Sequence, residues 1–223
     1  GACFLGPPVA IDNTLFTIAE VRGALYLLAL DPATGKLQWQ QQLVNLEQGI
    51  SPDVNRRRVG ATPSYAGGIL VCPTNAGAVV GVDLLTRSLV WAFNYQHETV
   101  RTDSNEADRP GGINGRIIGR LPPSTEAPTR GAQWSFAAPV VSQGKVLLAP
   151  PDGNALHAIN LRDGTVAWSV NRVDTSKDAL PPDYYLGGVF DQTVVLVGKQ
   201  NVHALDLKTG NKIWNVNTGI PVG

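Results

Sequence analysis

Residues 202–214 read VHALDLKTGNKIW, and three other stretches of the chain repeat this pattern. In each, an apolar run leads to an Asp or Asn, a turn sequence follows, and a Trp stands eight residues after the Asp or Asn. The other stretches are LLALDPATGKLQW (27–39), VVGVDLLTRSLVW (79–91) and LHAINLRDGTVAW (156–168). Self-similarity of this kind is the sequence signature of a repeat architecture. The fold is therefore decided by the four copies of this unit.

The Asp or Asn and the turn after it predict a β-hairpin in every unit. This anchor residue opens a tight turn with its side chain, and a Gly with positive φ closes the turn. The anchors are Asp31, Asp83, Asn160 and Asp206, and the turn glycines are Gly35, Gly164 and Gly210. The second unit carries Arg87 where the glycine is expected. A non-glycine residue in that conformation costs on the order of 1 kcal/mol, so either Arg87 bears this cost or the unit uses another turn type.

The residues before the anchor predict a strand that is buried on both faces. A small residue two positions before the anchor is followed by an aliphatic residue, which indicates a close neighbour on one face and bulkier packing on the other. The small residues are Ala29, Gly81, Ala158 and Ala204. A second hairpin precedes this strand in each unit, so each unit has four short strands, and no helical periodicity is visible. A four-stranded unit that recurs in this way is a β-propeller blade.

The blades form a single propeller segment over residues 1–223. They cover approximately residues 8–43, 61–94, 136–170 and 186–217, and an insertion at 95–131 separates the second blade from the third. A loop of this length in a compact domain is usually functional or disordered. Two interpretations of the insertion stay open: a binding surface over the propeller face, and a solvated segment of balanced charge.

Composition excludes two classes of partner. The chain has 18 basic and 18 acidic residues, so it lacks the net charge that binding to nucleic acid or anionic lipid would select. It is 43% apolar and 16% charged, as expected for a globular protein. No apolar run approaches the ~18 residues of a membrane-spanning segment. We therefore expect no nucleic-acid partner and no membrane insertion.

The apolar strand, the ALD motif or its variants, the T-G turn and the Trp together resemble the pyrroloquinoline-quinone-like (PQQ-like) propeller repeat. This repeat occurs in quinoprotein alcohol dehydrogenases and in the B-component lipoprotein of the outer-membrane barrel assembly machinery. The stretch from Pro63 to Trp91 is also similar to large repeat proteins of planctomycete-type bacteria. The resemblance implies a periplasmic or extracellular location. It also implies that a Trp docks each blade on its neighbour, a role that falls to Trp39, Trp91, Trp168 and Trp214.

The number of blades leads to a further expectation. Propellers of this family usually have six to eight blades, so we interpret the four blades as an arc of a larger propeller. The end blades of an arc expose apolar flanks that need a partner. We expect this partner to be other blades of the same protein or another protein chain.

No constellation of residues predicts catalysis. The chain has no G-x-S-x-G elbow. As the resemblance implies, the quinoprotein enzymes need a disulfide between adjacent cysteines, a calcium ion and an Asp base, whereas Cys3 and Cys72 are far apart. Asp103, Asn105 and Asp108 lack the Gly and Glu of a calcium loop. His157 and His203 share one repeat position, which favours a structural role. We therefore expect no catalytic or metal-binding residues, and neither PQQ nor calcium as a cofactor.

The sequence thus favours a non-catalytic PQQ-like propeller module that serves protein binding or scaffolding within a larger extracytoplasmic protein. Two alternatives remain. In the first alternative, the chain is a fragment of a quinone-dependent dehydrogenase. In the second, it is a structural assembly unit that docks through its end blades. The sequence leaves enzymatic activity open, but the lack of a reactive constellation of residues argues against it. Whether Cys3 pairs with Cys72 is also left open.

Overall fold

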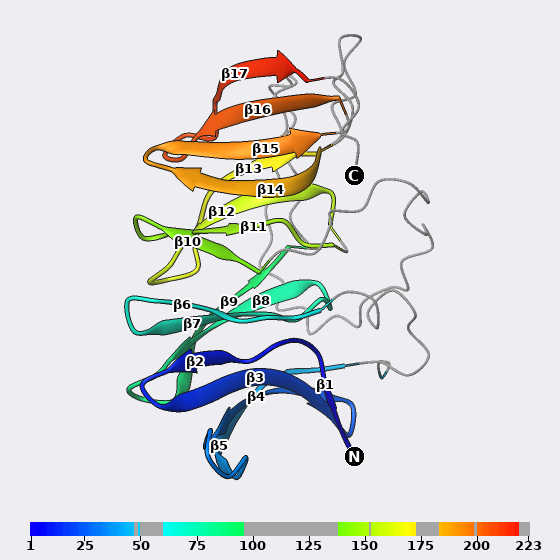
Figure 1. Ribbon diagram of the computed structural model, residues 1–223, viewed down its shortest axis with the longest axis vertical. Helices are drawn as coiled ribbons and strands as arrows, with labels where there is room; N and C mark the ends of the chain where they lie inside the picture. The colour runs from blue at the N-terminus through cyan, green and yellow to red at the C-terminus, as the bar shows by residue number, and fades with distance from the viewer. Residues whose placement is uncertain are drawn as a thin grey trace, which may run out of the picture.

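In the computed structural model, the chain forms four antiparallel β-sheets that are stacked in chain order (Figure 1). The structure describes residues 1–46, 49, 60–95, 138–151, 153–172, 183–198 and 200–218. No helix occurs within these ranges, so none of the described residues belongs to a helix that could cross a membrane. The predicted all-β fold, an arc of four propeller blades, is confirmed. The predicted insertion lies outside the described residues, apart from Tyr95.

The first sheet contains one more strand than the repeat predicts. Its strands are β1 (Ala2–Phe4), β2 (Val9–Ile11), β3 (Thr14–Val21), β4 (Ala24–Leu30) and β5 (Leu37–Asn45). Both β1 and β2 pair with β3: Cys3 lies opposite Glu20, and Val9 lies opposite Phe16. The edge of this sheet beside β3 is therefore made of two strands, and the first of them precedes the predicted start of the blade at residue 8.

The other three sheets are meanders of four strands, each strand pairing with the next one in the chain. The second blade contains β6 (Ser64–Ala66), β7 (Ile69–Pro73), β8 (Ala78–Asp83) and β9 (Ser88–Asn94). The third contains β10 (Val140–Ser142), β11 (Lys145–Leu148), β12 (Ala155–Asn160) and β13 (Val166–Asn171). The fourth contains β14 (Asp183–Phe190), β15 (Thr193–Gly198), β16 (Asn201–Asp206) and β17 (Lys212–Asn217).

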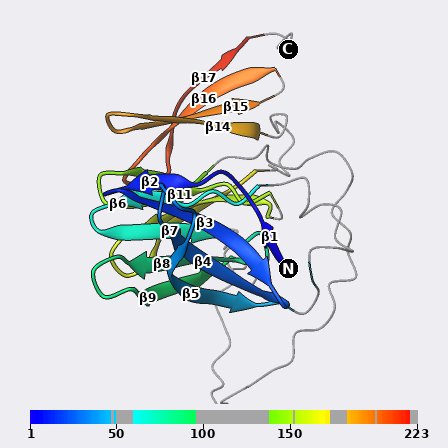
Figure 2. The same ribbon diagram turned by 60° about the horizontal axis from the view of Figure 1, so that its bottom comes forward.

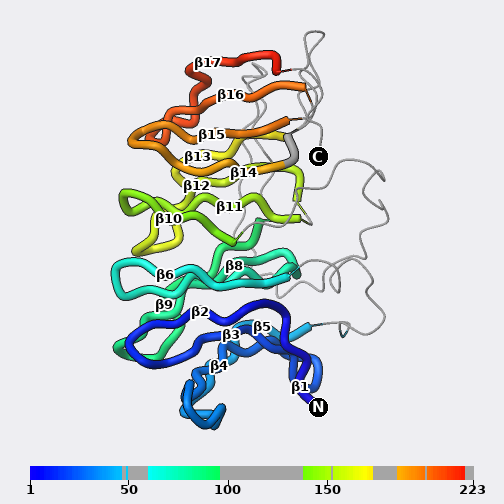
Figure 3. The backbone as a smooth tube through the Cα atoms, viewed as in Figure 1, coloured from blue at the N-terminus to red at the C-terminus, as the bar shows by residue number. Residues whose placement is uncertain are grey.

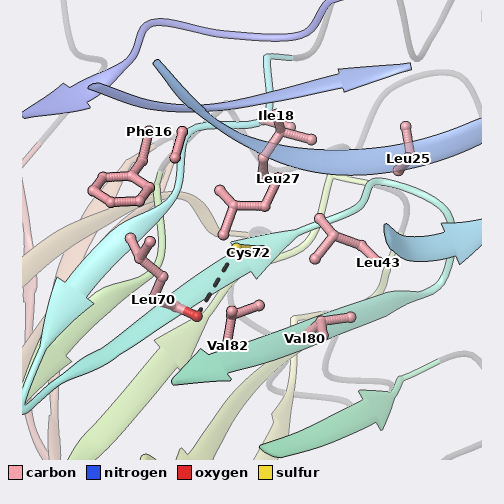
Figure 4. Packing of buried hydrophobic residues seen from close by; sticks show 11 residues of the cluster. Phe16, Ile18, Leu25, Leu27, Leu43, Leu70, Cys72, Val80 and Val82 are labelled. Atoms are coloured by element: carbon pink, nitrogen blue, oxygen red, sulfur yellow. Dashed lines mark hydrogen bonds between the residues drawn. The ribbon is translucent and has the colours of Figure 1, made fainter. Parts of the chain in front are cut away.

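The hydrophobic core lies between the blades, in three clusters. Each cluster joins two consecutive sheets, because successive residues of a strand point to opposite faces and the middle strands are buried on both. In the first cluster, Leu27 of β4 faces Leu70 and Val82 of the second blade (Figure 4). Cys72 is buried in the same cluster and Cys3 is exposed, and both are free thiols. Burial raises the pKa of the Cys72 thiol well above its ordinary range.

The first and fourth blades lie at opposite ends of the stack. The trace of the chain passes from the blue first blade to the red end of the fourth without returning (Figure 3). The turned view also shows the fourth sheet standing apart from the first (Figure 2). Contacts between strands of different blades join neighbouring blades, as in β5 with β9, β6 with β10 and β10 with β14. Each end of the described arc thus presents a sheet face that no other described blade covers.

Candidate interaction site

The turn after the anchor residue is built around the Asp side chain. Oδ1 of Asp31 accepts hydrogen bonds from the N–H of Ala33 at 3.0 Å, the N–H of Thr34 at 2.8 Å and the hydroxyl of Thr34 at 2.8 Å. The N–H of Gly35 donates to the carbonyl of Asp31 at 2.8 Å. The Thr34 hydroxyl and N–H stabilise the carboxylate, so the pKa of Asp31 lies below its ordinary value. Asp83 and Asp206 form the same arrangement with Thr86 and Thr209.

In the third unit, two residues, Asn160 and Asp163, make the side-chain hydrogen bonds of the turn. Asn160 donates from Nδ2 to the hydroxyl of Thr165 at 2.6 Å, and its Oδ1 accepts from Nζ of Lys145 at 2.6 Å. The carboxylate in this turn belongs to Asp163, which accepts from the N–H and the hydroxyl of Thr165. These hydrogen bonds lower the pKa of Asp163. The third unit keeps the same backbone turn, since the N–H of Gly164 donates to the carbonyl of Asn160 at 2.9 Å, and its carboxylate comes from Asp163, three residues after the anchor.

All four turns end in the same backbone conformation. The φ values are 68° at Gly35, 69° at Gly164 and 74° at Gly210, and 57° at Arg87. Of the two options that the sequence leaves open for Arg87, the structure shows the first: the turn is the same, and a non-glycine residue occupies its left-handed position. Such a residue is strained by contact of its Cβ with the backbone.

The register of each hairpin explains the small residue before the anchor. It lies directly opposite the Trp in all four units, the pairs being Ala29 with Trp39, Gly81 with Trp91, Ala158 with Trp168, and Ala204 with Trp214. A Cβ at Gly81 would overlap the indole ring of Trp91. A shift of register follows each pair, so that the outer strand bulges beside the Trp. The close neighbour indicated by the sequence is therefore the Trp of the same blade.

Trp91 links the second blade to the third. Its indole N–H donates to the carbonyl of Leu161 at 2.7 Å. The ring covers the turn glycine of the third blade, where a Cβ at Gly164 would lie 2.8 Å from Cδ2 of Trp91. Trp91 is 8% exposed. One side chain thus fills the space over a hairpin turn and satisfies a backbone carbonyl of the adjacent blade.

Trp168 links the third blade to the fourth in the same way. Its indole N–H donates to the carbonyl of Leu207 at 2.9 Å, and a Cβ at Gly210 would lie 2.7 Å from Cδ2 of the ring. Leu161 and Leu207 both directly follow the anchor of their unit. We call this arrangement of a Trp, the turn glycine of the next blade and the carbonyl after the next anchor the Trp–Gly joint.

The link between the first and second blades differs. The turn position of the second blade is Arg87, and its guanidinium carbon lies 5.7 Å from the centre of the Trp39 ring. Phe16 of the same blade also packs beside Trp39, with 5.8 Å between the ring centres. A guanidinium over an indole face is a cation–π contact, which takes the place of the packing between ring and glycine.

The two remaining predicted residues, Trp214 and Gly35, pack against no other described blade. Trp214 is 40% exposed, and its neighbours Ile213 and Val216 on β17 are 52% and 53% exposed. At the other end of the arc, no described atom outside Gly35 and its two chain neighbours lies within 4 Å of the place where a Cβ on Gly35 would stand. Within the described residues, β17 therefore carries the Trp half of a joint, and the first blade carries the glycine half.

Two buried histidines, His157 on β12 and His203 on β16, occupy the same repeat position in the third and fourth blades. Nδ1 of His157 lies 2.9 Å from Oγ of Ser169, and the ring centres of Phe93 and Tyr95 are 5.3 and 6.2 Å away. Burial lowers the pKa of His157 to about 4. Burial, helped by the charge of Lys212, also lowers the pKa of His203 to about 4. Both rings are therefore neutral at pH 7. No group of His, Cys, Asp and Glu suited to a metal ion occurs among the described residues.

Sequence reasoning missed two parts of this site. The carbonyls of Leu161 and Leu207 carry no side-chain signal, although their position directly after the anchor recurs in every unit. The only sequence signal for the contact between Arg87 and Trp39 is that the second unit has an arginine instead of the turn glycine. That arginine lies in a different blade from the Trp that it contacts. Both features depend on the placement of one blade against the next.

Four-stranded blades with this joint define a β-propeller built from PQQ-like repeats. A family model described as "Outer membrane protein assembly factor BamB" matches residues 26–221, and the chain belongs to this family. None of the curated proteins matches the chain.

Solved structures share the fold. BamB from Moraxella catarrhalis is similar over 97% of this chain and 54% of its own, with 19% identity and a TM-score of 0.54. A europium-containing methanol dehydrogenase is similar over 98% of this chain and 42% of its own, with 16% identity and a TM-score of 0.55. Quinohemoprotein alcohol dehydrogenase from Comamonas testosteroni is similar over 99% of this chain and 37% of its own, with 15% identity and a TM-score of 0.55. This chain thus spans about half of these structures or less.

Proposed function

We propose that this chain is a protein-binding or scaffolding module of a larger extracytoplasmic protein, periplasmic or extracellular, and that it binds through its end blades. The observation that carries this proposal is the exposed Trp half of a joint on β17. The family description supports it, since it names an assembly factor of the outer membrane.

The physical argument compares equivalent tryptophans. Trp91 and Trp168 are buried by the next blade and donate their indole N–H groups to it. Trp214 stands at the same repeat position but remains exposed, beside Ile213 and Val216. Burying a large apolar side chain is worth about 1.5–3 kcal/mol. A protein surface that covers this face gains that energy at several neighbouring residues, which favours binding of a protein over binding of a small polar molecule.

Site-specific photo-crosslinking tests this proposal. A photoreactive amino acid replaces Ile213 in the protein as its host produces it, and a matched variant carries the same group at Leu89, which is also exposed on the outer strand of its blade. We expect irradiation to join a polypeptide to position 213 and none to position 89. Mass spectrometry of the adduct identifies the joined segment. Absence of any adduct at position 213 would contradict a binding role for this face.

The alternative of a quinone-dependent dehydrogenase is favoured by the likeness in fold to methanol and alcohol dehydrogenases. The cysteines do not support it, because Cys3 is exposed at the start of the chain and Cys72 is buried between the first two blades. We expect no change in the quinone absorbance spectrum when the purified protein is titrated with PQQ and Ca²⁺, and no dye-linked oxidation of alcohols. Tight quinone binding with alcohol oxidation would favour the dehydrogenase.

A further inference from the structure

We infer that the side chain across the sheet from each Trp selects the kind of turn that the next blade must present. Phe16 fits Trp39 to the arginine turn of the second blade, and Val195 fits Trp214 to a glycine turn. For Trp214 the inference rests on the proposed function, because it describes the polypeptide that covers that face. This polypeptide is a further blade of the larger protein, with a glycine at the left-handed position of its outer turn.

Three side chains lie in a row on one face of each sheet, which in the first three blades is the face that meets the next blade. The Trp lies opposite the small residue of the central strand, and that residue lies opposite a third one on the strand before it. We call this third residue the cross-strand residue. It is aromatic in the first blade, where it is Phe16, and aliphatic in the other blades, where it is Val71, Leu147 or Val195.

An aliphatic cross-strand residue accompanies each Trp–Gly joint. Val71 and Leu147 are fully buried in the same clusters as Trp91 and Trp168. Each ring lies so close to the next turn that a Cβ on the turn glycine would stand 2.8 or 2.7 Å from its Cδ2. Carbon atoms in favourable contact are about 3.5–4.0 Å apart. A Trp in this position therefore excludes every turn residue except glycine.

The phenyl ring of Phe16 accompanies the other kind of joint. Its centre lies 5.8 Å from the centre of the Trp39 ring, and it occupies more space beside the indole than a Val or Leu side chain does. Trp91 and Trp168 donate their indole N–H groups to a carbonyl of the next blade, whereas among the described residues none accepts that of Trp39. Trp39 instead contacts Arg87, which carries the Cβ that the other joints exclude.

The open face of the fourth blade has the aliphatic kind of row. Val195 lies opposite Ala204, which lies opposite Trp214. Trp214 is 40% exposed and Val195 is half-buried. The same row in the second and third blades accepts a glycine turn, so a further blade on this face would repeat an interface that the chain already forms twice. The chain spans about half or less of the solved structures that share its fold, which leaves room for such a blade in a larger protein.

Hydrogen exchange of the indole N–H groups tests the selection within the chain. It is measured by NMR on the native protein with isotope-labelled tryptophan, and the signals are assigned with Trp→Phe variants. We expect slow exchange in the two Trp–Gly joints and fast exchange at Trp39. When Phe16→Val and Arg87→Gly are combined, exchange at Trp39 should slow by about tenfold, because its indole then reaches the carbonyl of Leu84. Each of the two changes alone should leave it fast.

The reverse change tests the second blade. Val71→Phe should speed exchange of the Trp91 indole by about tenfold, because the phenyl ring takes space that the indole needs. Val71→Leu is the matched control, since it also adds volume but places at this position the residue type of Leu147. Circular dichroism establishes that both variants are folded. Equal exchange in the two variants, or slow exchange at Trp39 with Arg87→Gly alone, overturns selection by the cross-strand residue.

Photo-crosslinking from position 213 tests the partner of the Trp214 face. We expect the adduct to join position 213 to a segment of the same polypeptide whose outer turn carries a glycine. Val195→Phe should lower the yield of this adduct severalfold, and the matched Val195→Leu should not.

The outcomes separate this inference from the proposed function. An adduct with a different protein overturns the assignment to a further blade and leaves the proposed binding role standing. A yield that Val195→Phe leaves unchanged, or an adduct with a turn that lacks glycine, overturns the selection by Val195. Absence of any adduct contradicts the proposed function, and with it the assignment of a partner to Trp214, whereas the exchange measurements at Trp39 and Trp91 decide the selection rule independently.

Discussion

At the scale of single residues, the fate of each Trp depends on the blade that follows it. The sequence makes Trp39, Trp91, Trp168 and Trp214 equivalent, and it predicts the turn and the small residue opposite each ring. It could not predict their different environments, because burial of the indole depends on a residue in another blade. Arg87 illustrates this: its conformation is local, but its contact with Trp39 arises only when two blades pack together.

The docking role of Trp168 predicts a large loss of stability on truncation. Trp168→Ala leaves a cavity over Gly210 and an unpaired Leu207 carbonyl, so we expect unfolding to require about 3–5 kcal/mol less free energy. Trp214→Ala serves as the matched control and should lower the free energy of unfolding by less than about 1 kcal/mol, because this side chain is 40% exposed. Urea titrations followed by circular dichroism measure both. Equal effects of the two truncations would argue against a docking role.

Arg87 combines a strained backbone with a favourable contact, and a double-mutant cycle separates the two. Arg87→Gly relieves strain of about 1 kcal/mol but loses a cation–π contact of about 0.5–1 kcal/mol, so the single change should be nearly neutral. In a Trp39→Leu background the contact is already absent, and the same change should stabilise the protein by about 1 kcal/mol. Equilibrium unfolding of the wild type, the two single variants and the double variant gives the coupling free energy between Arg87 and Trp39. An identical effect of Arg87→Gly in both backgrounds would show that the guanidinium and the indole do not interact.

At the scale of elements, the hairpins were predictable because their signals are local. The anchor, the turn and the alternation of burial all lie within about a dozen residues of one another, so the sequence predicts the middle strands and their turns. Strand β1 was not predictable, because it is three residues long, is exposed, and pairs with the distant end of β3. The replacement of the anchor carboxylate by Asp163 was likewise missed, since it depends on which side chain reaches Thr165.

The buried His157 predicts that stability falls as the solution becomes acidic. Its native pKa of about 4 lies below the ordinary 6.5, so the unfolded chain binds a proton first and stability is lost as the pH falls from about 7. The loss should reach about 2 kcal/mol at pH 5, with His203 adding a change of the same sign. The turn carboxylates act only at lower pH, because their native pKa values lie below 3.8.

Urea unfolding at pH 7 and pH 5 measures this dependence. The control is His157→Leu, which places at this position the residue type that the first blade has at Leu28. We expect the variant to lose about 2 kcal/mol less than the wild type between the two pH values. An unchanged slope would mean that His157 is protonated in the native protein.

At the scale of the whole molecule, the described residues form a series of blades, and neighbouring blades are joined by contacts such as those of β5 with β9, β6 with β10 and β10 with β14. In such a series, stability is close to a sum of terms for blades and for the interfaces between them. Weakening one interface should therefore affect the blades beside it and leave distant blades unchanged.

Hydrogen exchange of Trp168→Ala tests this independence. The protection of amides in β15 and β16 should fall by about 3 kcal/mol, because the fourth blade then loses the contact of Trp168 with its turn. Amides of β3 and β4 in the first blade should keep the protection that they have in the wild type. Mass spectrometry of peptic fragments resolves the two groups. A uniform loss over all blades would indicate a single cooperative unit.

The difference between the joints has a consequence for how such a gene changes in length. A tandem duplication of the segment that encodes a glycine-turn blade inserts a copy whose turn fits the preceding Trp and whose Trp fits the following turn. The segment that encodes the second blade carries Arg87. A copy of it placed later in the chain would put an arginine against a Trp that now packs directly on a turn glycine. We therefore expect an array of such blades to tolerate the gain or loss of a glycine-turn blade by unequal recombination more readily than a displacement of the second blade.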